Sequence, residues 1–243
     1  LKGIEFLKKN SGRFVLGFVL PLIHEIEERF QKLPEIKKVI VAGSVRRMKE
    51  TIGDIDILVV SSKPKKVMDF FVNMPEVVHI YGKGRAKSMV RLENEMDVDL
   101  RVVEEKSFGA ALNYFTGSKE HNIGLRKIAQ EKNWKLNEYG LYKKIKNKWI
   151  QIAGKIEEEI YKKLGLNYIE PELRENNGEI EAAANKKLPK LINYSDLKGD
   201  LQIQTNWSDG ANSIEEMAEE AMKLGLEYIV ITDHTKSLAM TGG

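Results

Sequence analysis

An apolar, strand-like segment that carries two carboxylates on one face constrains the fold of this chain most. The segment is Gly53-Asp54-Ile55-Asp56-Ile57-Leu58, and it follows a turn that begins at Gly43-Ser44. Because alternate side chains of a strand share a face, Asp54 and Asp56 lie side by side, about 7 Å apart along the backbone. Two adjacent anions repel each other unless cations lie between them. The pair therefore predicts a site for divalent metal, and the alternative is a pair of strand-end carboxylates on a solvated face.

A second acidic strand and the glycine turn extend this pattern towards phosphate chemistry. Asp97-Val98-Asp99-Leu100-Arg101 offers another alternating pair, which would complete an oxygen cage for Mg²⁺. Gly43-Ser44 lets the backbone approach a phosphate, a helix starting there would direct free amides at it, and Arg47 adds a charge-assisted contact. With two ions bound, one lowers the pKa of an attacking hydroxyl and the other neutralises a triphosphate. These residues therefore predict nucleotidyl transfer.

The order of apolar patterns predicts an α+β chain. Period-three and period-four spacing indicates helices, whereas short runs of Val, Ile and Leu indicate strands. We expect a helix within residues 14–33, strands at 38–42, 55–60, 77–81, 88–92 and 96–103, helices at 67–72, 108–133 and 155–164, and a strand pair within 135–152. Residues 166–196 have the composition of a linker. A strand, a helix and a strand then follow within 197–232, which is typical of a parallel sheet.

Composition excludes several classes of protein. Lys plus Arg number 39 against 36 Asp plus Glu, and the net charge of +3 excludes a basic tail binder and an acidic disordered chain. The absence of cysteine excludes disulfides, thiolate zinc sites and a cysteine nucleophile, and suits the cytoplasm, where we expect this protein. The longest apolar stretch, residues 14–23, is about half of a membrane span, so no membrane partner is expected. Because the chain begins with Leu1, we read it as a piece of a longer protein.

Four stretches carry a family resemblance. They read GSVRRMKETIGDIDILVV at 43–60, VDLRVV at 98–103, ALNYFTGSKEHNIGLRKIA at 111–129 and KLNEYGLY at 135–142. In this order, across residues 12–165, they resemble the family X DNA polymerases, of the polymerase beta type. The resemblance implies a nucleotidyltransferase palm, which is a mixed sheet with helices on one face, followed by a small α/β thumb.

The resemblance also implies roles for individual residues. Asp54, Asp56 and Asp99 would be the catalytic and metal-binding residues, holding two Mg²⁺ ions with Mn²⁺ as a substitute, and Asp99 would help to activate the primer 3′ hydroxyl. The implied nucleotide-binding residues are Gly43, Ser44, Arg47, Gly53, Tyr114, Phe115, Gly117 and Asn122. Arg126 and Arg101 would contact the template or other DNA. Without the resemblance, Tyr114 and Phe115 would be interpreted as core aromatics.

The last segment resembles the opening of a polymerase and histidinol phosphatase (PHP) domain, a distorted (β/α) barrel. The similar residues are Gly199 to Thr205, Ser208-Asp209-Gly210 and Ile231 to His234. Gln202 and Gln204 stand where that family has a His-x-His metal pair, and neutral amides are poor ligands for transition metals. We therefore expect this part to be inactive. A first βαβ part alone leaves an unpaired edge, which predicts self-association through this unit.

The expected organisation has five regions. They are residues 1–34, the end of the fingers with a connecting helix; 35–107, the palm; 108–165, the thumb; 166–196, a linker; and 197–243, the truncated start of the PHP domain. The expected function is template-directed DNA polymerisation from dNTPs on gapped or primer–template DNA in repair. The alternatives are a template-independent nucleotidyltransferase and a DNA-binding fragment without catalysis.

Two features remain open between readings. The lysines between residues 135 and 155 would either follow a DNA backbone or form a solvated face. Asp97 lies where polymerase beta has a basic residue near the primer end, so its carboxylate would either alter primer approach or point into solvent.

Overall fold

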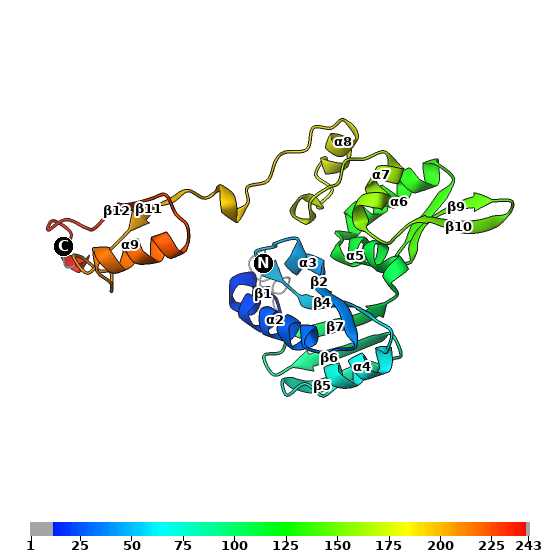
Figure 1. The fold of residues 1–243 in the computed structure, drawn as a ribbon, viewed down its shortest axis with the longest axis horizontal. Coiled ribbons are helices and arrows are strands. Elements are labelled where there is room, and N and C mark those ends of the chain that lie inside the picture. Colours follow the sequence, from blue (N-terminus) through cyan, green and yellow to red (C-terminus); the bar gives the residue numbers. More distant parts are fainter. Residues whose placement is uncertain (1–11, 242–243) are drawn as a thin grey trace, which may run out of the picture. The chain divides into compact units, whose positions relative to one another are not determined.

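The computed structural model describes residues 12–241, and the chain divides into two compact units, residues 1–188 and 189–243. Each unit is described by itself (Figure 1). The expected fingers segment lies partly in residues 1–11, outside the described residues. Among residues 12–241, no helix has the length and apolar character that crossing a membrane requires.

A five-stranded mixed sheet forms the region predicted to be the palm, which is called the palm below. Its order is β2-β4-β7-β6-β5, with β2 at Ile36–Val41, β4 at Asp54–Ser61, β7 at Asp97–Val103, β6 at Lys87–Leu92 and β5 at Val77–Lys83. The central strands β4 and β7 are parallel, and the other pairs are antiparallel. In the β4–β7 register Asp54 lies beside Asp97 and Asp56 beside Asp99. The two acidic segments predicted from the sequence are therefore neighbours at one end of the sheet.

Helices cover both faces of this sheet. Helices α2 (Leu16–Gln31) and α4 (Pro64–Val72) pack in one apolar cluster with Ile57 and Val59 of β4. Helix α5 (Phe108–Thr116) packs in another cluster with Leu58 and Val60, which alternate onto the opposite face. The expectation of helices on one face is wrong, because β4 is apolar on both faces and needs cover on each.

Short elements complete the palm around the turn at Gly43. Helix α3 (Gly43–Arg46) follows β2 directly. Strands β1 (Phe14–Val15) and β3 (Thr51–Ile52) pair antiparallel, which ties the segment before α2 to the segment before β4. This pairing brings residue 13 close to the end of β4.

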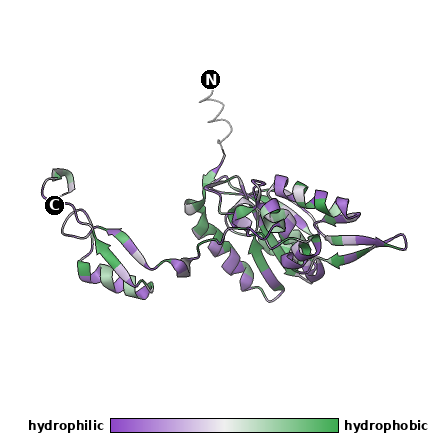
Figure 2. Cartoon of the chain, turned by 90° about the horizontal axis from the view of Figure 1, so that it is seen from above, coloured by the Kyte–Doolittle hydropathy of each residue, from purple (hydrophilic) through white to green (hydrophobic). Residues whose placement is uncertain are grey.

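The region predicted to be the thumb, which is called the thumb below, combines helices with a three-stranded antiparallel sheet. Helix α5 is followed by α6 (Lys119–Glu131), the strands β8 (Trp134–Asn137), β9 (Gly140–Ile145) and β10 (Lys148–Ala153), and helix α7 (Glu157–Leu164). The helical region expected at 108–133 is divided at Gly117-Ser118, where the peptide bond is cis and the Ser118 hydroxyl accepts the backbone N–H of His121 at 3.2 Å. Residues 135–152 were expected to form a pair of strands, but this region contains the three strands β8, β9 and β10. The β9–β10 hairpin projects from the thumb (Figure 2).

Residues 166–188 belong to the first unit, so the linker predicted at 166–196 is wrong over most of its length. They include the short helices η2 (Pro171–Leu173) and α8 (Glu179–Ala184). Leu166, Ile169 and Ile180 are buried in the same apolar cluster as thumb residues. Glu179 fixes this segment, because its carboxylate accepts the backbone N–H groups of Asn176 and Asn177 at 2.9 and 2.7 Å.

The second unit is a strand, a helix and a strand. Strands β11 (Gly199–Ile203) and β12 (Tyr228–Ile231) pair parallel, and helix α9 (Ile214–Lys223) connects them, as predicted. The Ser213 hydroxyl and the Glu216 carboxylate cap the first turn of α9 reciprocally. Short 3₁₀ turns lie at Tyr194–Asp196 and Ala239–Thr241.

Candidate active site

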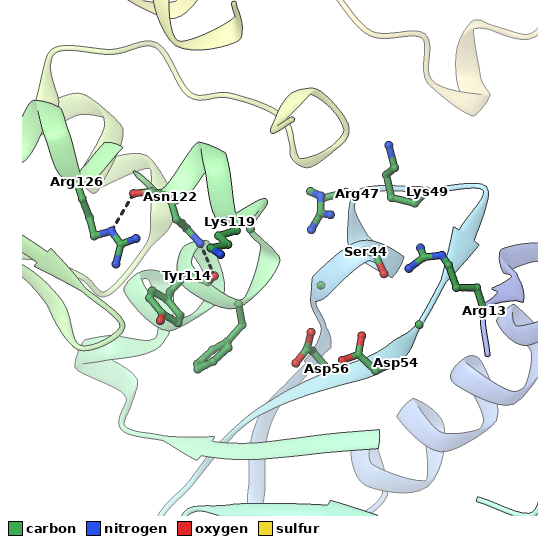
Figure 3. Close-up of a pocket in the computed structure, with 14 residues that line it drawn as sticks. Arg13, Ser44, Arg47, Lys49, Asp54, Asp56, Tyr114, Lys119, Asn122 and Arg126 are labelled. Atoms are coloured by element: carbon green, nitrogen blue, oxygen red, sulfur yellow. Dashed lines mark hydrogen bonds between the residues drawn. The ribbon is translucent and has the colours of Figure 1, made fainter. Parts of the chain in front are cut away.

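A polar pocket of about 440 Å³ lies between the palm and the thumb (Figure 3). The predicted residues that line it are Gly43, Ser44, Arg47, Gly53, Asp54, Asp56, Tyr114, Phe115, Gly117, Asn122 and Arg126. The close-up shows the palm cations on one side, Tyr114 and Asn122 on the other, and the two carboxylates of β4 at the floor. Of the residues predicted to form the site, Asp99 and Arg101 are not among the lining residues.

The two carboxylates of β4 are held close to other negative charge. Burial, together with the negative charges of the neighbouring Asp54 and Asp99, raises the pKa of Asp56 to about 7. Burial also raises the pKa of Asp54, with Asp99 and Asp97 acting in the same direction. The surroundings of Asp54 and Asp56 therefore disfavour their charged forms, and a bound cation would favour them.

Gly43 makes this arrangement sterically feasible. Its φ of +61° is one that residues with a side chain rarely adopt, and a Cβ built on it would lie 2.5 Å from Oδ2 of Asp56. A residue with a side chain at position 43 would thus displace the carboxylate. Glycine at position 43 lets the backbone of the turn approach Asp56 without moving this carboxylate.

Asp99 is turned towards a lysine. Its Oδ2 lies 3.0 Å from Nζ of Lys87, and its Oδ1 is buried with no hydrogen-bond partner among residues 12–241. Among residues 12–241, no three His, Cys, Asp or Glu side chains are grouped closely enough to hold a metal ion. The structure thus places Asp54 and Asp56 together in the pocket, and Asp99 beside Asp56 on β7 with its side chain paired to Lys87.

The arginine expected to contact phosphate is already paired. Nε of Arg47 donates to Oε1 of Glu175 at 2.8 Å, and its Nη1 donates to the carbonyl oxygen of Thr116. Lys49 also lies 3.6 Å from the same Glu175 oxygen. Ser44 lies in the first turn of α3, at the edge of the pocket.

The thumb wall is held by hydrogen bonds and aromatic contacts. Nδ2 of Asn122 donates to the carbonyl oxygen of Tyr114 at 2.7 Å, and Nε of Arg126 donates to the carbonyl oxygen of Asn122 at 3.2 Å. Tyr114 and Phe115 meet edge to face at 5.1 Å. The Arg101 guanidinium lies 4.3 Å above the centre of the Phe115 ring, so this predicted DNA contact packs against the thumb.

Three lining cations were not predicted from the sequence: Arg13, Lys49 and Lys119. Arg13 donates from Nε to the Thr51 hydroxyl at 3.0 Å, and its position depends on the β1–β3 pairing. Two-residue strands have no periodic signal. Lys119 directly follows Gly117-Ser118 and begins α6. Its place beside these two residues is the sequence signal from which it could have been predicted.

Asp97 forms an ion pair, so of its two readings the one in which the carboxylate points into solvent is wrong. Its two carboxylate oxygens accept from Nε and Nη2 of Arg91 at 2.8 and 3.0 Å. Arg91 lies directly opposite on β6. The hydrogen bonds from Arg91 lower the pKa of Asp97, so its charge is neutralised locally.

In the second unit, Gln204 and the acids form ordinary polar contacts. Nε2 of Gln204 donates to the Thr232 hydroxyl at 3.2 Å. Asp233 accepts from the Ser208 hydroxyl at 2.6 Å and from Thr205, and these hydrogen bonds lower its pKa. Nε2 of His234 lies 3.8 Å from Oδ1 of Asp209.

Comparison with known proteins relates this fold and pocket to polymerases. The palm and thumb together have the α+β architecture of polymerase beta. Residues 111–175 match the family model of the DNA polymerase beta thumb. Solved structures of Leishmania infantum polymerase beta share the fold: a ternary P/T complex matches with a TM-score of 0.58 at 22% identity, covering 71% of this chain and 80% of that chain.

Two curated relatives extend the similarity. The DNA polymerase/3′-5′ exonuclease PolX of Bacillus subtilis is 38% identical over 237 residues, which is 97% of this chain and 41% of the relative. The repair DNA polymerase X of African swine fever virus (strain Badajoz 1971 Vero-adapted) is 27% identical over 146 residues, 57% of this chain and 82% of the relative. The chain thus spans less than half of the Bacillus protein. The similarity to family X, polymerase-beta-like proteins that the motifs indicated is confirmed.

Proposed function

We propose that the first unit is the catalytic part of a template-directed DNA polymerase, which adds a deoxynucleotide to a primer 3′ hydroxyl in gap-filling repair. The pocket carries the proposal. It combines adjacent carboxylates of raised pKa, a wall of cations and an aromatic wall in one cavity, with the order of elements found in polymerase beta. Its substrates would be a dNTP and gapped or primer–template DNA.

The carboxylates suit a divalent cation. Asp54, Asp56 and Asp99 supply hard oxygen donors, and the buried Oδ1 of Asp99 has no hydrogen-bond partner in the described part of the chain. We assign these three residues to hold Mg²⁺ or Mn²⁺, which when bound would activate the 3′ hydroxyl and stabilise negative charge on the phosphates. For this, Asp99 must leave Lys87 and turn towards Asp56, its neighbour on β4. A cation there also relieves the repulsion between the acids.

Cations of the palm and of the segment before it would hold the triphosphate. Arg13, Arg47 and Lys49 line one side of the pocket, and Lys119 lies on the thumb side. The backbone at Gly43 and Ser44 adds amide donors close to the carboxylates. These groups would orient the leaving pyrophosphate and keep the α-phosphorus in line with the primer hydroxyl.

The thumb wall would hold the sugar, the base and the template. Tyr114 and Phe115 present rings to the pocket, and Asn122 and Arg126 lie one helical turn apart on α6. Arg101 would act through Phe115, on which it stacks. These contacts distinguish the proposal from a template-independent nucleotidyltransferase, which has no need for a template-side arginine.

The remaining assignments are proposals about the longer protein. The second unit would be the start of a PHP-like domain, inactive in metal-dependent hydrolysis because Gln202 and Gln204 replace imidazole ligands. Residues 35–107 would be the palm and residues 108–188 the thumb with its extension. We further propose a cytoplasmic protein, and self-association through the second unit.

Primer extension tests the proposal. A labelled primer on a one-nucleotide gapped duplex is incubated with Mg²⁺ and each dNTP, for the wild type, Asp99→Ala and Asp97→Ala. Asp97 lies on the same strand but is paired to Arg91, so it is the matched control. We expect the complementary nucleotide alone to be incorporated, with loss in Asp99→Ala and retention in Asp97→Ala.

Other results point to the alternatives. Incorporation that ignores the template base would favour a template-independent nucleotidyltransferase. No incorporation, with normal binding of the Mg²⁺-dNTP measured by calorimetry, would favour a DNA-binding fragment without catalysis.

A further inference from the structure

The β9–β10 hairpin exposes large apolar side chains that the pocket does not use. Trp149 is 49% exposed and Ile150 46%. The hairpin turns at Lys146-Asn147, where φ is +45° and +62°, and both strands continue to the tip. Figure 1 shows this pair of strands projecting from the thumb, and Figure 2 shows polar and apolar residues along it. Exposing an indole costs free energy unless a partner covers it.

The hairpin is also strongly positive. Its lysines are Lys143, Lys144, Lys146 and Lys148, and within residues 12–241 none of them forms an ion pair. The β9–β10 register places Lys144 directly opposite Trp149, so an ammonium and an indole share one face. The hairpin therefore offers a flat ring beside unneutralised positive charge.

A single nucleic-acid strand fits this chemistry best. Its bases have flat apolar faces that stack on aromatic rings, and its phosphates attract lysines. In a duplex the base faces are already stacked, so a duplex would use only the lysines. A protein partner would need acidic groups to match each lysine, and it would not need the flat indole of Trp149.

We propose that the β9–β10 hairpin binds single-stranded DNA, with a base stacked on Trp149 and the backbone along Lys144 and its neighbouring lysines. The proposal rests on the proposed function in one respect: in that reaction the bound strand is the unpaired template. The hairpin thereby gives the thumb a hold on the template outside the pocket.

The test measures binding of a labelled oligodeoxythymidylate to the whole 243-residue chain by fluorescence anisotropy. Trp149→Ala should weaken binding about tenfold, as for loss of one stacked base. Lys144→Glu should weaken it further and reduce the salt dependence by about one to two phosphate contacts. The matched controls are Trp207→Ala, an indole 74% exposed in the second unit, and Lys163→Glu, an exposed lysine of α7.

Equal affinity of Trp149→Ala and the wild type would overturn the proposal. An equal loss in Lys163→Glu would also overturn it, since binding would then follow overall charge. Gap filling and Mg²⁺-dNTP binding are measured on the wild type in parallel. Their failure would count against the proposed function, whereas unchanged oligonucleotide binding in Trp149→Ala counts only against the hairpin.

Glu175 supports a second inference from a separate observation. Its carboxylate lies at hydrogen-bond distance from Arg47, at 2.8 Å, and 3.6 Å from Lys49, so one acid partly offsets the charge of two cations of the pocket. The residue comes from the segment that follows the thumb, between η2 and α8. A polyphosphate approaching Arg47 and Lys49 meets this negative charge.

We infer that Glu175 competes with the triphosphate for these cations and so sets the affinity for the nucleotide. This inference rests on the proposed function. Glu175→Gln removes the charge and keeps an oxygen that accepts from Nε of Arg47. Glu175→Ala removes the charge and the acceptor together. The pair of variants separates competition by charge from positioning of the arginine.

Calorimetry with inorganic triphosphate and with Mg²⁺-dATP tests the inference. Glu175→Gln should bind both roughly fivefold more tightly than the wild type, in a salt-dependent manner. Glu172→Gln, an exposed acid of the same segment, should not change binding. Unchanged or weaker binding in Glu175→Gln would overturn the inference. Absence of Mg²⁺-dATP binding in the wild type would instead count against the proposed function.

Discussion

Two regions of the first unit bury carboxylates, and they treat them in opposite ways. In the pocket, burial and neighbouring acids raise the pKa of Asp56 to about 7. In the thumb, burial alone would raise the pKa of Glu157, but hydrogen bonds and charges from Arg46 and Arg174 outweigh it and lower the pKa. The degree of burial therefore does not set the direction of the pKa shift. The sign of the nearest charges sets it.

The Glu157 network shows what full neutralisation looks like. Its carboxylate accepts from Nη2 of Arg46 at 2.7 Å, from Nη1 of Arg174 at 2.6 Å and from the hydroxyl of Tyr168 at 3.1 Å. Arg46 comes from the palm and Arg174 from the segment after the thumb, so three parts of the chain meet at this acid. Within the part of the chain that the structure describes, the side chains of Asp54 and Asp56 form no ion pair or hydrogen bond of this kind, so a bound cation would relieve their repulsion.

Breaking the thumb network should have the largest effect. Glu157→Ala leaves the Arg174 guanidinium, which is fully buried, without its acid, and should destabilise the chain by about 3–5 kcal/mol. Urea unfolding followed by circular dichroism measures the change. The exposed neighbour Glu158→Ala is the control, and similar losses in both variants would contradict the role of the network.

Neutralising Asp56 should slow incorporation by at least about a hundredfold, because the charge stabilisation that a metal supplies is worth several kcal/mol. Single-turnover gap filling with Asp56→Asn measures the rate. Circular dichroism on the same samples serves as the folding control. Near-normal incorporation would show that this carboxylate is not part of the metal site.

The same substitution should stabilise the metal-free chain. The folded-state pKa of Asp56, about 7, lies above the ordinary value of 3.8. The free energy of unfolding therefore falls as the pH rises from about 4 to about 7, because the folded state then has to hold a charged carboxylate that its surroundings disfavour. Asp56→Asn removes this cost. Its free energy of unfolding should exceed that of the wild type by about 1–3 kcal/mol at pH 8, and by little at pH 4. Equal stability at both pH values would contradict the raised pKa.

Lys87 should have the smallest effect. Its ammonium lowers the pKa of Asp56 and pairs with Asp99, but the lysine is 43% exposed and its charge is screened by water. Lys87→Met should raise the pKa of Asp56 further and destabilise the metal-free chain at pH 8 by about 0.5 kcal/mol. Carbon-detected NMR titration of the aspartates follows the shift, and a pKa of Asp56 that stays constant or falls would contradict it.

Sequence patterns predicted the central sheet and most of the pocket, because β4 and β7 alternate apolar residues with carboxylates. They did not reveal Arg13, because its position depends on the pairing of the two-residue strands β1 and β3. The Asp99 side chain is oriented towards Lys87. Strand periodicity predicts the face on which a side chain lies, but it does not predict which neighbouring charge the side chain pairs with.

The segment after the thumb was mistaken for a linker for a different reason. Its prolines and asparagines are typical of loops, and its few apolar residues, such as Ile169 and Ile180, show no helical or strand period. They pack because Glu179 fixes the backbone and pairs with the buried His121 ring at 2.6 Å. Tertiary contacts of this kind have no local signature.

The glycine at position 43 has a consequence for how this chain tolerates change. Any other residue there would need a backbone conformation that it avoids and would press its Cβ against Asp56. A library of single substitutions selected for folding alone should therefore accept Asn at position 56 and reject nearly every residue at position 43. Selected for activity, it should reject both. The contrast between the two selections would show that position 43 is needed for folding and that the carboxylate at position 56 is needed for activity alone.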